Sequence, residues 1–154
     1  MRLSVIAVGE RMPAWVTQAV ADYARRMPKH WPLQVVTVPA AKRGRASPSV
    51  MRAEEAQRLL AARPKSGITV ALERTGQAWT SERLADNINM WEQRYSAASF
   101  LIGGPDGLDA VCRDSAEACW SLSQLTLPHA LVRVVVAEQL YRAWTLVANH
   151  PYHR

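Results

Sequence analysis

Two kinds of apolar pattern alternate along the chain. Continuous apolar runs predict four buried strands, at Leu3–Val8, Leu33–Val38, Ile68–Leu72 and Ser99–Ile102. Apolar residues at helical spacing predict helices that begin near Pro13, Val50, Thr80 and Asp109, and a long last helix over about His129–Ala148. The stretch Ser121–Leu127 fits either a strand or an extended loop. This alternation predicts a single α/β domain over residues 1–154, with a mostly parallel sheet and helices on both of its faces.

The loops that follow the predicted strands are the segments to search for a site. In open α/β sheets, ligands bind beyond the carboxyl ends of the strands. Five segments hold that position: Gly9–Met12, Pro39–Pro48, Glu73–Trp79, Gly103–Leu108 and Leu122–His129.

The last predicted helix is apolar on two faces. One face consists of Val132, Val136, Leu140 and Val147. The other consists of Leu131, Val134, Val135, Tyr141 and Trp144. Since one face can pack on the sheet and the other needs a partner, we expect a homodimer.

Length and cysteine content restrict the class of protein. A chain of 154 residues can bury a core without disulfides or a structural metal. Cys112 and Cys119 are separated by roughly 10 Å along a helix, too far to pair, and unpaired thiols fit a reducing compartment. The sequence shows no signal-peptide pattern and no apolar run long enough to span a bilayer. We therefore expect a cytoplasmic protein that does not associate with membranes.

The positive charge is concentrated in the first third of the chain. Residues 1–50 hold eight basic and two acidic side chains, which accounts for the whole net charge of +6. The densest cluster is Lys42, Arg43 and Arg45, in the loop after the second predicted strand. Arginine binds phosphate groups in a bidentate manner, so the charge favours a nucleic-acid partner.

Two loops and the C-terminal tail carry the candidate chemistry. Gly103–Gly107 is neither a Walker loop nor a dinucleotide fingerprint, which leaves ATP hydrolysis and NAD binding without support. The apolar, hydroxyl-containing loop Leu122–Leu127 suits a flat heteroaromatic ligand such as adenine. The tail Asn149–Arg154 holds His, Tyr and Arg side chains, which can stack on bases and contact phosphates. His150 and His153 have no neighbouring carboxylate or cysteine, so no metal site is expected.

Four motifs in this order resemble a known family. They are the segments Ile102–Gly107, Ser121–His129, Val136–Trp144 and Asn149–Arg154. Together they are similar to the bacterial ribosomal RNA large-subunit methyltransferase H family, within the SPOUT superfamily. The resemblance covers the whole chain apart from Ser47–Ser66, where there is least to match. It implies methyl transfer from S-adenosylmethionine to N3 of a pseudouridine in large-subunit (23S) ribosomal RNA, by a homodimer with a C-terminal trefoil knot.

The resemblance also implies a set of site residues. The positions that match the family's cofactor site are Leu72, Gly103, Leu122, Ser123, Gln124, Leu125, Thr126 and Leu127. N3 carries a proton, so transfer calls for a base or an anion-stabilising cation. We assign catalytic roles in the tail: His153 as proton acceptor, Arg154 as the stabilising cation and Tyr152 as a stacking partner of the base. Lys42, Arg43 and Arg45 are the candidate RNA-binding residues.

Several alternatives stay open at this point. A basic, non-catalytic module that binds RNA or the ribosome predicts no cofactor binding. A flavodoxin-like or nucleotide-binding enzyme lacks the expected phosphate loop. The sequence does not decide whether the tail serves its own or a partner's cofactor site. It also does not decide between free ribosomal RNA and assembled ribosomes as substrate, although a chain this short leaves no room for a separate RNA-binding domain.

Overall fold

The computed structural model describes all residues, 1–154. Five strands alternate with helices: β1 (Arg2–Val8), α1 (Ala14–Arg26), β2 (Leu33–Val38), α2 (Pro48–Ala61), β3 (Ile68–Ala78), α3 (Ser81–Glu92), β4 (Ala97–Ile102), α4 (Ala110–Asp114), β5 (Ala118–Ser121), α5 (His129–Val147) and a short 3-10 helix η1 (Pro151–His153). Thr80 caps α3, since its side chain accepts a hydrogen bond from Arg83 N–H at 3.1 Å. No helix has both the length and the apolar character that a membrane span requires.

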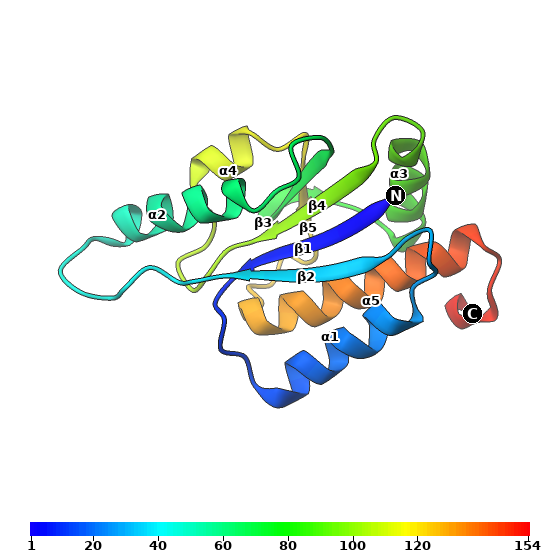
Figure 1. Ribbon diagram of the computed structural model, residues 1–154, viewed down its shortest axis with the longest axis horizontal. Coiled ribbons are helices and arrows are strands. Elements are labelled where there is room, and N and C mark those ends of the chain that lie inside the picture. Colours follow the sequence, from blue (N-terminus) through cyan, green and yellow to red (C-terminus); the bar gives the residue numbers. More distant parts are fainter.

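The strands form one parallel sheet in the order β2-β1-β4-β3-β5. In the centre of the sheet, Val5 of β1 pairs with Val35 of β2 and with Phe100 of β4. All five strands therefore end at the same edge, and the loops that follow them gather there (Figure 1). The predicted α/β fold with a parallel sheet is confirmed.

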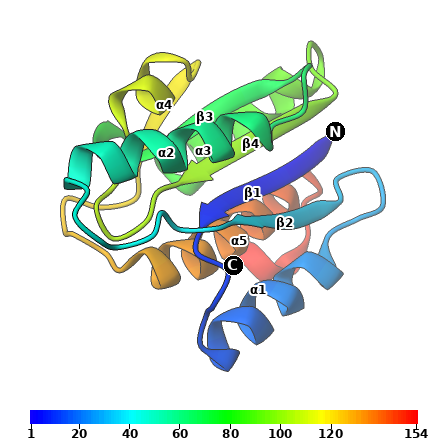
Figure 2. The ribbon, with the colours of Figure 1, turned by 60° about the vertical axis from the view of Figure 1, so that its left-hand side comes forward.

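Helices cover both faces of the sheet, and β1 shows why. Its alternate residues Leu3, Val5 and Ala7 lie in a core shared with α1, α3 and α5. The intervening Ile6 and Val8 lie in a second core shared with α2 and α4. Figure 2 shows the sheet between α2 and α4 on one side and α1 and α5 on the other.

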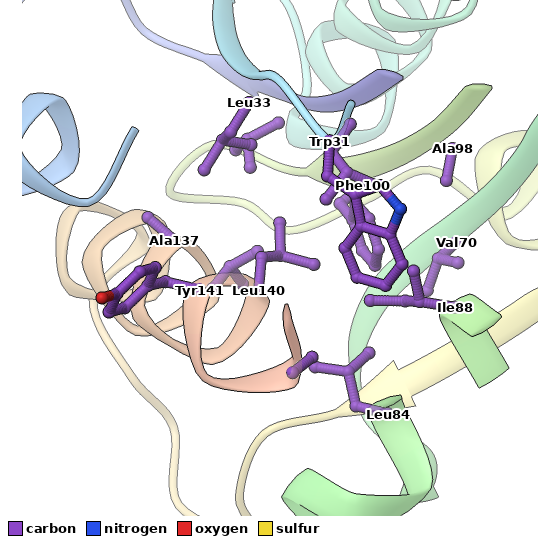
Figure 3. Packing of buried hydrophobic residues seen from close by; sticks show 14 of the residues in the cluster. Trp31, Leu33, Val70, Leu84, Ile88, Ala98, Phe100, Ala137, Leu140 and Tyr141 are labelled. Atoms are coloured by element: carbon purple, nitrogen blue, oxygen red, sulfur yellow. The ribbon is translucent and has the colours of Figure 1, made fainter. Parts of the chain in front are cut away.

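The larger core is built on aromatic and branched side chains (Figure 3). Trp31 and Phe100 are fully buried beside Leu140 of α5. The Trp31 indole N–H donates to Glu92 Oε1 at 2.7 Å, so this large side chain is buried without an unsatisfied donor.

The structure corrects two predicted boundaries around β3 and β5. The segment Glu73–Trp79 is not a simple loop, because β3 continues to Ala78. Pairing with β5 shifts register between Leu72 and Gln77, so the extra residues bulge out and the strand resumes. The last strand ends at Ser121, which leaves Leu122–Leu127 as an extended loop.

The second apolar face of α5 is only partly available to a partner. Tyr141 is 6% exposed and lies against Tyr23 and Tyr152 of its own chain. It is therefore a core residue, and its assignment to the interface-facing side is wrong. Val134 and Val135 remain half-buried on α5.

Candidate functional site

A pocket of about 250 Å³ opens at the carboxyl edge of the sheet. Its wall comes from the middle of β3, the loop after β4, the end of β5 with the loop that follows it, and the start of α5. Of the eight predicted cofactor positions, Leu72, Gly103, Leu122, Ser123, Leu125, Thr126 and Leu127 line it. Gln124 is exposed and lies outside this lining.

The loop Leu122–Leu127 offers unpaired backbone groups to this pocket. The only hydrogen bond donated by its backbone N–H groups is from Leu125 N–H to Ser123 Oγ, at 3.0 Å. Ser121 Oγ donates to Ser123 C=O at 3.0 Å, which fixes the turn out of β5. Leu125 is 72% exposed although it lines the pocket. Free amides beside apolar side chains suit a ligand that is flat and carries ring nitrogens.

Gly103 is required by the packing of its own loop. A Cβ at this position would lie 2.6 Å from the Gly107 carbonyl carbon and 2.8 Å from Leu108 N. The packing of the loop against itself therefore requires a glycine here, apart from any contact with a ligand. The loop folds back tightly enough to exclude any side chain, and this fold gives the pocket its shape.

Trp120 of β5 contributes an unsatisfied donor to the wall of the pocket. It is buried, lines the pocket and has an indole N–H without a partner. Its ring stacks on Trp79 at 5.5 Å and meets the edge of Phe100 at 6.2 Å. A buried donor without a partner favours a ligand with an acceptor at this place.

His129 stands at the first turn of α5, where the pocket meets the rest of the carboxyl edge. Burial, together with the positive charge of Arg133, lowers the pKa of His129, while the Glu55 carboxylate opposes this shift. Its imidazole is therefore neutral at pH 7 and able to accept a proton.

The structure does not bring the predicted catalytic tail to this pocket. Tyr152, His153 and Arg154 follow the far end of α5, which is 19 residues or about 27 Å long. Figure 1 shows the tail at the opposite edge of the sheet from the strand ends. Within one chain, the tail and the pocket are therefore separate.

Side chains of α5 hold the tail in place. The Tyr152 hydroxyl donates to Glu138 Oε1 at 3.2 Å, and Arg142 donates to the same oxygen from Nε at 2.9 Å and from Nη2 at 2.6 Å. The guanidinium of Arg142 lies 5.2 Å from the centre of the Tyr152 ring. Burial and the neighbouring Tyr23 and Glu138 raise the pKa of Tyr152, so its phenol stays protonated. The Glu138–Arg142 pair therefore anchors the tail on α5.

The predicted RNA-binding residues lie in the loop between β2 and α2. Lys42, Arg43 and Arg45 are all exposed and follow the carboxyl end of β2. The base of this loop is fixed by Glu55 of α2, whose Oε1 accepts a hydrogen bond from Ala41 N–H at 3.0 Å. The cluster is thus presented at the same edge of the sheet as the pocket.

Comparison with known proteins identifies the class. A family model described as "Predicted SPOUT methyltransferase" matches residues 1–153. The chain therefore belongs to the SPOUT methyltransferase family, as its resemblance implied. As a methyltransferase it is an enzyme, which decides against the non-catalytic and flavodoxin-like alternatives.

One relative matches the chain from end to end. The chain is 47% identical, over 156 residues and 100% of both proteins, to "Ribosomal RNA large subunit methyltransferase H" of Marinomonas sp. (strain MWYL1). Among solved structures, TrmJ from Z. mobilis ZM4 matches 92% of this chain and 70% of its own at 14% identity, with a TM-score of 0.52. The SpoU methyltransferase AviRb from Streptomyces viridochromogenes, solved with AdoMet, matches 90% of this chain at 15% identity and a TM-score of 0.47. This chain spans 56% of AviRb.

The pocket fits S-adenosylmethionine. Apolar side chains suit an adenine ring, and the free amides of Leu122–Leu127 and the unpartnered Trp120 N–H suit its ring nitrogens and the ribose. Sequence reasoning missed several lining residues: Glu73, Arg74, Ile102, Gly104, Gly107, Leu108, Trp120, His129 and Val132. Most of them flank a predicted position by one or two residues, so proximity to the strand ends was the available signal.

Proposed function

We propose that this protein methylates N3 of a pseudouridine in large-subunit ribosomal RNA, on assembled ribosomes. The observation that carries the proposal is the end-to-end match, at 47% identity, to a protein named ribosomal RNA large subunit methyltransferase H. The choice of N3 follows from the family resemblance. The unpaired thiols of Cys112 and Cys119 support a location in the reducing cytoplasm, where ribosomes are.

The chemistry asks the chain for positioning more than for reactive groups. When bound, S-adenosylmethionine supplies an electrophilic methyl group on a sulfonium. The residues of the pocket hold the donor, and the protein must place N3 in line with the methyl group. It must also accept the N3 proton and stabilise the charge that develops on the ring.

The distance between tail and pocket supports a homodimer in which each tail serves its partner's pocket. The tail follows the far end of α5, and even Tyr152, which folds back onto Glu138, contacts the helix nine residues, or about 13 Å, from His129 in the pocket of its own chain. The exposed Leu125 at the pocket and the half-buried Val134 and Val135 on α5 give a second protomer an apolar surface to cover. In such a dimer, the active site is complete only when both copies are present.

The basic loop supports a substrate rich in phosphate. Lys42, Arg43 and Arg45 are exposed at the edge of the sheet where the pocket opens. Phosphate contacts give affinity and orientation but little sequence choice. We expect the shape of the assembled ribosome to supply the remaining selectivity.

The test is a methylation assay with purified protein and a labelled methyl donor. Free ribosomal RNA, isolated large subunits and whole ribosomes from cells lacking this activity are compared. We expect label in ribosomal RNA of the assembled particles and a reverse-transcription stop at one pseudouridine, because an N3 methyl group blocks base pairing. Label at another atom or in another RNA would contradict the proposed substrate, and equal rates on free RNA would contradict the choice of ribosomes.

A further inference from the structure

A second cavity, of about 350 Å³, lies beside the cofactor pocket. It is lined by the loop Gly9–Met12 after β1, by Pro39 after β2, and by Pro105 in the segment Gly103–Gly107 after β4. His129 lines both cavities, so the two meet at its imidazole. A site next to the methyl donor, and not used by the donor itself, is where an acceptor has to lie.

The loop after β1 is held by its carbonyl groups and leaves its amides free. Arg133 is 2% exposed, and its Nη2 donates to Val8 C=O at 2.6 Å and to Gly9 C=O at 2.8 Å. Gly9 has φ +104°, a conformation that turns the chain there and that side chains disfavour. The backbone N–H groups of the next three residues, Glu10–Met12, make no hydrogen bond within the chain. Three successive residues that line this cavity therefore have backbone donors without a partner in the chain.

These donors match the chemistry of a uracil-type base. Such a base carries its N3–H between two carbonyl oxygens, and loss of the N3 proton places negative charge on both of them. Backbone N–H groups fixed in advance stabilise that charge. Pro39 and Pro105 offer flat apolar surfaces to the ring.

The imidazole of His129 is suited to take the N3 proton. The charged groups that act on it are Arg133 of its own helix and Glu55 of α2. The other charged residues that line its two cavities are Glu10 and Arg11 of the loop after β1, and Glu73 and Arg74 of β3. Burial, then Arg133, lower its pKa, and Glu55 opposes them. At neutral pH the ring is unprotonated and can act as a base.

We propose that the second cavity is the subsite for the target base, and that His129 receives the N3 proton. The proposal rests on the proposed function and names the place of its substrate. As N3 forms its bond to the methyl carbon, the carbon–sulfur bond breaks and its electron pair goes to sulfur. The proton leaves N3 for His129 and then passes to water.

The first test is single-turnover methylation of ribosomes by His129→Asn as a function of pH. We expect the wild-type rate to rise with pH and level off, and the variant to be about 10²- to 10⁴-fold slower without that plateau. Because His129 also lines the donor pocket, the rates are compared at saturating S-adenosylmethionine, and calorimetry measures the variant's own donor affinity and shows that it is folded. A variant with the wild-type rate and pH profile would overturn the role of His129.

The second test needs no methylation and keeps the subsite falsifiable if His129→Asn fails to fold. Wild-type protein labelled with ¹⁵N and saturated with S-adenosylhomocysteine is titrated with pseudouridine and with its N3-methyl derivative. We expect pseudouridine to shift the amide signals of Glu10–Met12, and the methylated base to shift them at several-fold higher concentration. Shifts elsewhere, equal shifts with both compounds or no shifts would overturn the subsite. If pseudouridine binds there but ribosomes are not methylated, the proposed function fails while the subsite stands.

Discussion

The two ends of α5 are built in opposite ways. At the His129 end, two cavities open, and the backbone N–H groups of Glu10–Met12 and most of those of Leu122–Leu127 have no partner within the chain. At the Tyr152 end, side chains satisfy one another, since Tyr152 and Arg142 both donate to Glu138. The first region has unused hydrogen-bonding capacity and space for ligands. The second is held rigidly but encloses no ligand of its own, so its chemistry needs another molecule placed against it.

The prediction with the largest expected effect concerns the region at the His129 end of α5. Gly103→Val places a branched side chain where even a Cβ would lie 2.6 Å from Gly107. Overpacking of this kind costs about 1–3 kcal/mol, and here the loop that shapes the pocket has to move. We expect S-adenosylmethionine affinity to fall at least about a hundredfold in calorimetry.

Gly44→Ala is the matched control for this substitution. Gly44 also lies in a loop, but an added Cβ would meet nothing within 4 Å. Its affinity for the donor should equal that of the wild type. Unchanged affinity in a folded Gly103→Val protein would show that the loop is more adaptable than its packing indicates.

The sequence was sufficient for the parts of the site that depend on order along the chain. The strand ends Val8, Val38 and Ile102 and the loops after them follow from apolar runs and glycines, because parallel strands must end at one edge. The extension of β3 to Ala78 was missed because its pairing with β5 depends on a bulge that no periodicity signals.

Relations across space were beyond the sequence. Tyr141 is apolar on one side and lies at interface spacing, yet Tyr23 of α1 covers it, and only the packing of α1 on α5 shows this. Likewise, the tail directly follows α5 in the sequence. Its separation from the pocket is evident only from the fold, in which α5 runs antiparallel to the strands. The trefoil knot stays a prediction from the family resemblance, and the homodimer stays a prediction from that resemblance and from the two apolar faces of α5.

The next prediction asks whether the two regions cooperate between protomers. Gly103→Val removes the pocket, and a Tyr152→Ala/Arg154→Ala double variant removes the groups of the tail. Each alone should lose about 10²-fold or more in activity. When the two are unfolded and refolded together in equal amounts, half of the dimers are mixed, and one of the two sites in each mixed dimer has an intact pocket and an intact tail. We therefore expect recovery of about a quarter of wild-type activity.

The outcome separates action within one chain from action between chains. If each tail served its own pocket, no site in a mixed dimer would be complete and activity would stay at the level of the single variants. Mixing two preparations of the same tail variant is the control for refolding itself. Sedimentation of the wild type as a monomer at micromolar concentration would contradict the dimer directly.

A smaller effect concerns the basic loop beside the pocket. We expect ribosome binding to weaken in a triple variant that combines Lys42→Ala, Arg43→Ala and Arg45→Ala. The slope of log binding constant against log salt concentration should become shallower by about one unit per lost phosphate contact. Affinity for S-adenosylmethionine should not change, because these side chains do not line the pocket. As a control, Lys65→Ala removes an exposed basic residue on the loop before β3, at the opposite edge of the sheet. Normal methylation by the triple variant at every salt concentration would exclude this loop from RNA binding.

The prediction with the smallest expected effect concerns the influence of the Glu55 charge on the pKa of His129. Glu55 is 5% exposed on α2, and its negative charge works against the lowering of the His129 pKa. Glu55→Gln retains an oxygen that can accept the hydrogen bond from Ala41 N–H but removes that charge. The pKa of His129 should therefore fall further, so the imidazole loses its proton at lower pH. If His129 takes the N3 proton, the rise of the single-turnover rate with pH should move to lower pH. The rate on the plateau should be unchanged, and the variant should exceed the wild type only on the acidic side.

Glu54→Gln is the control, because Glu54 is exposed, pairs with Arg58 and has no part in the shift of the His129 pKa. A profile that moves to higher pH, or that moves equally in both variants, would show that the Glu55 carboxylate does not act on the rate through His129.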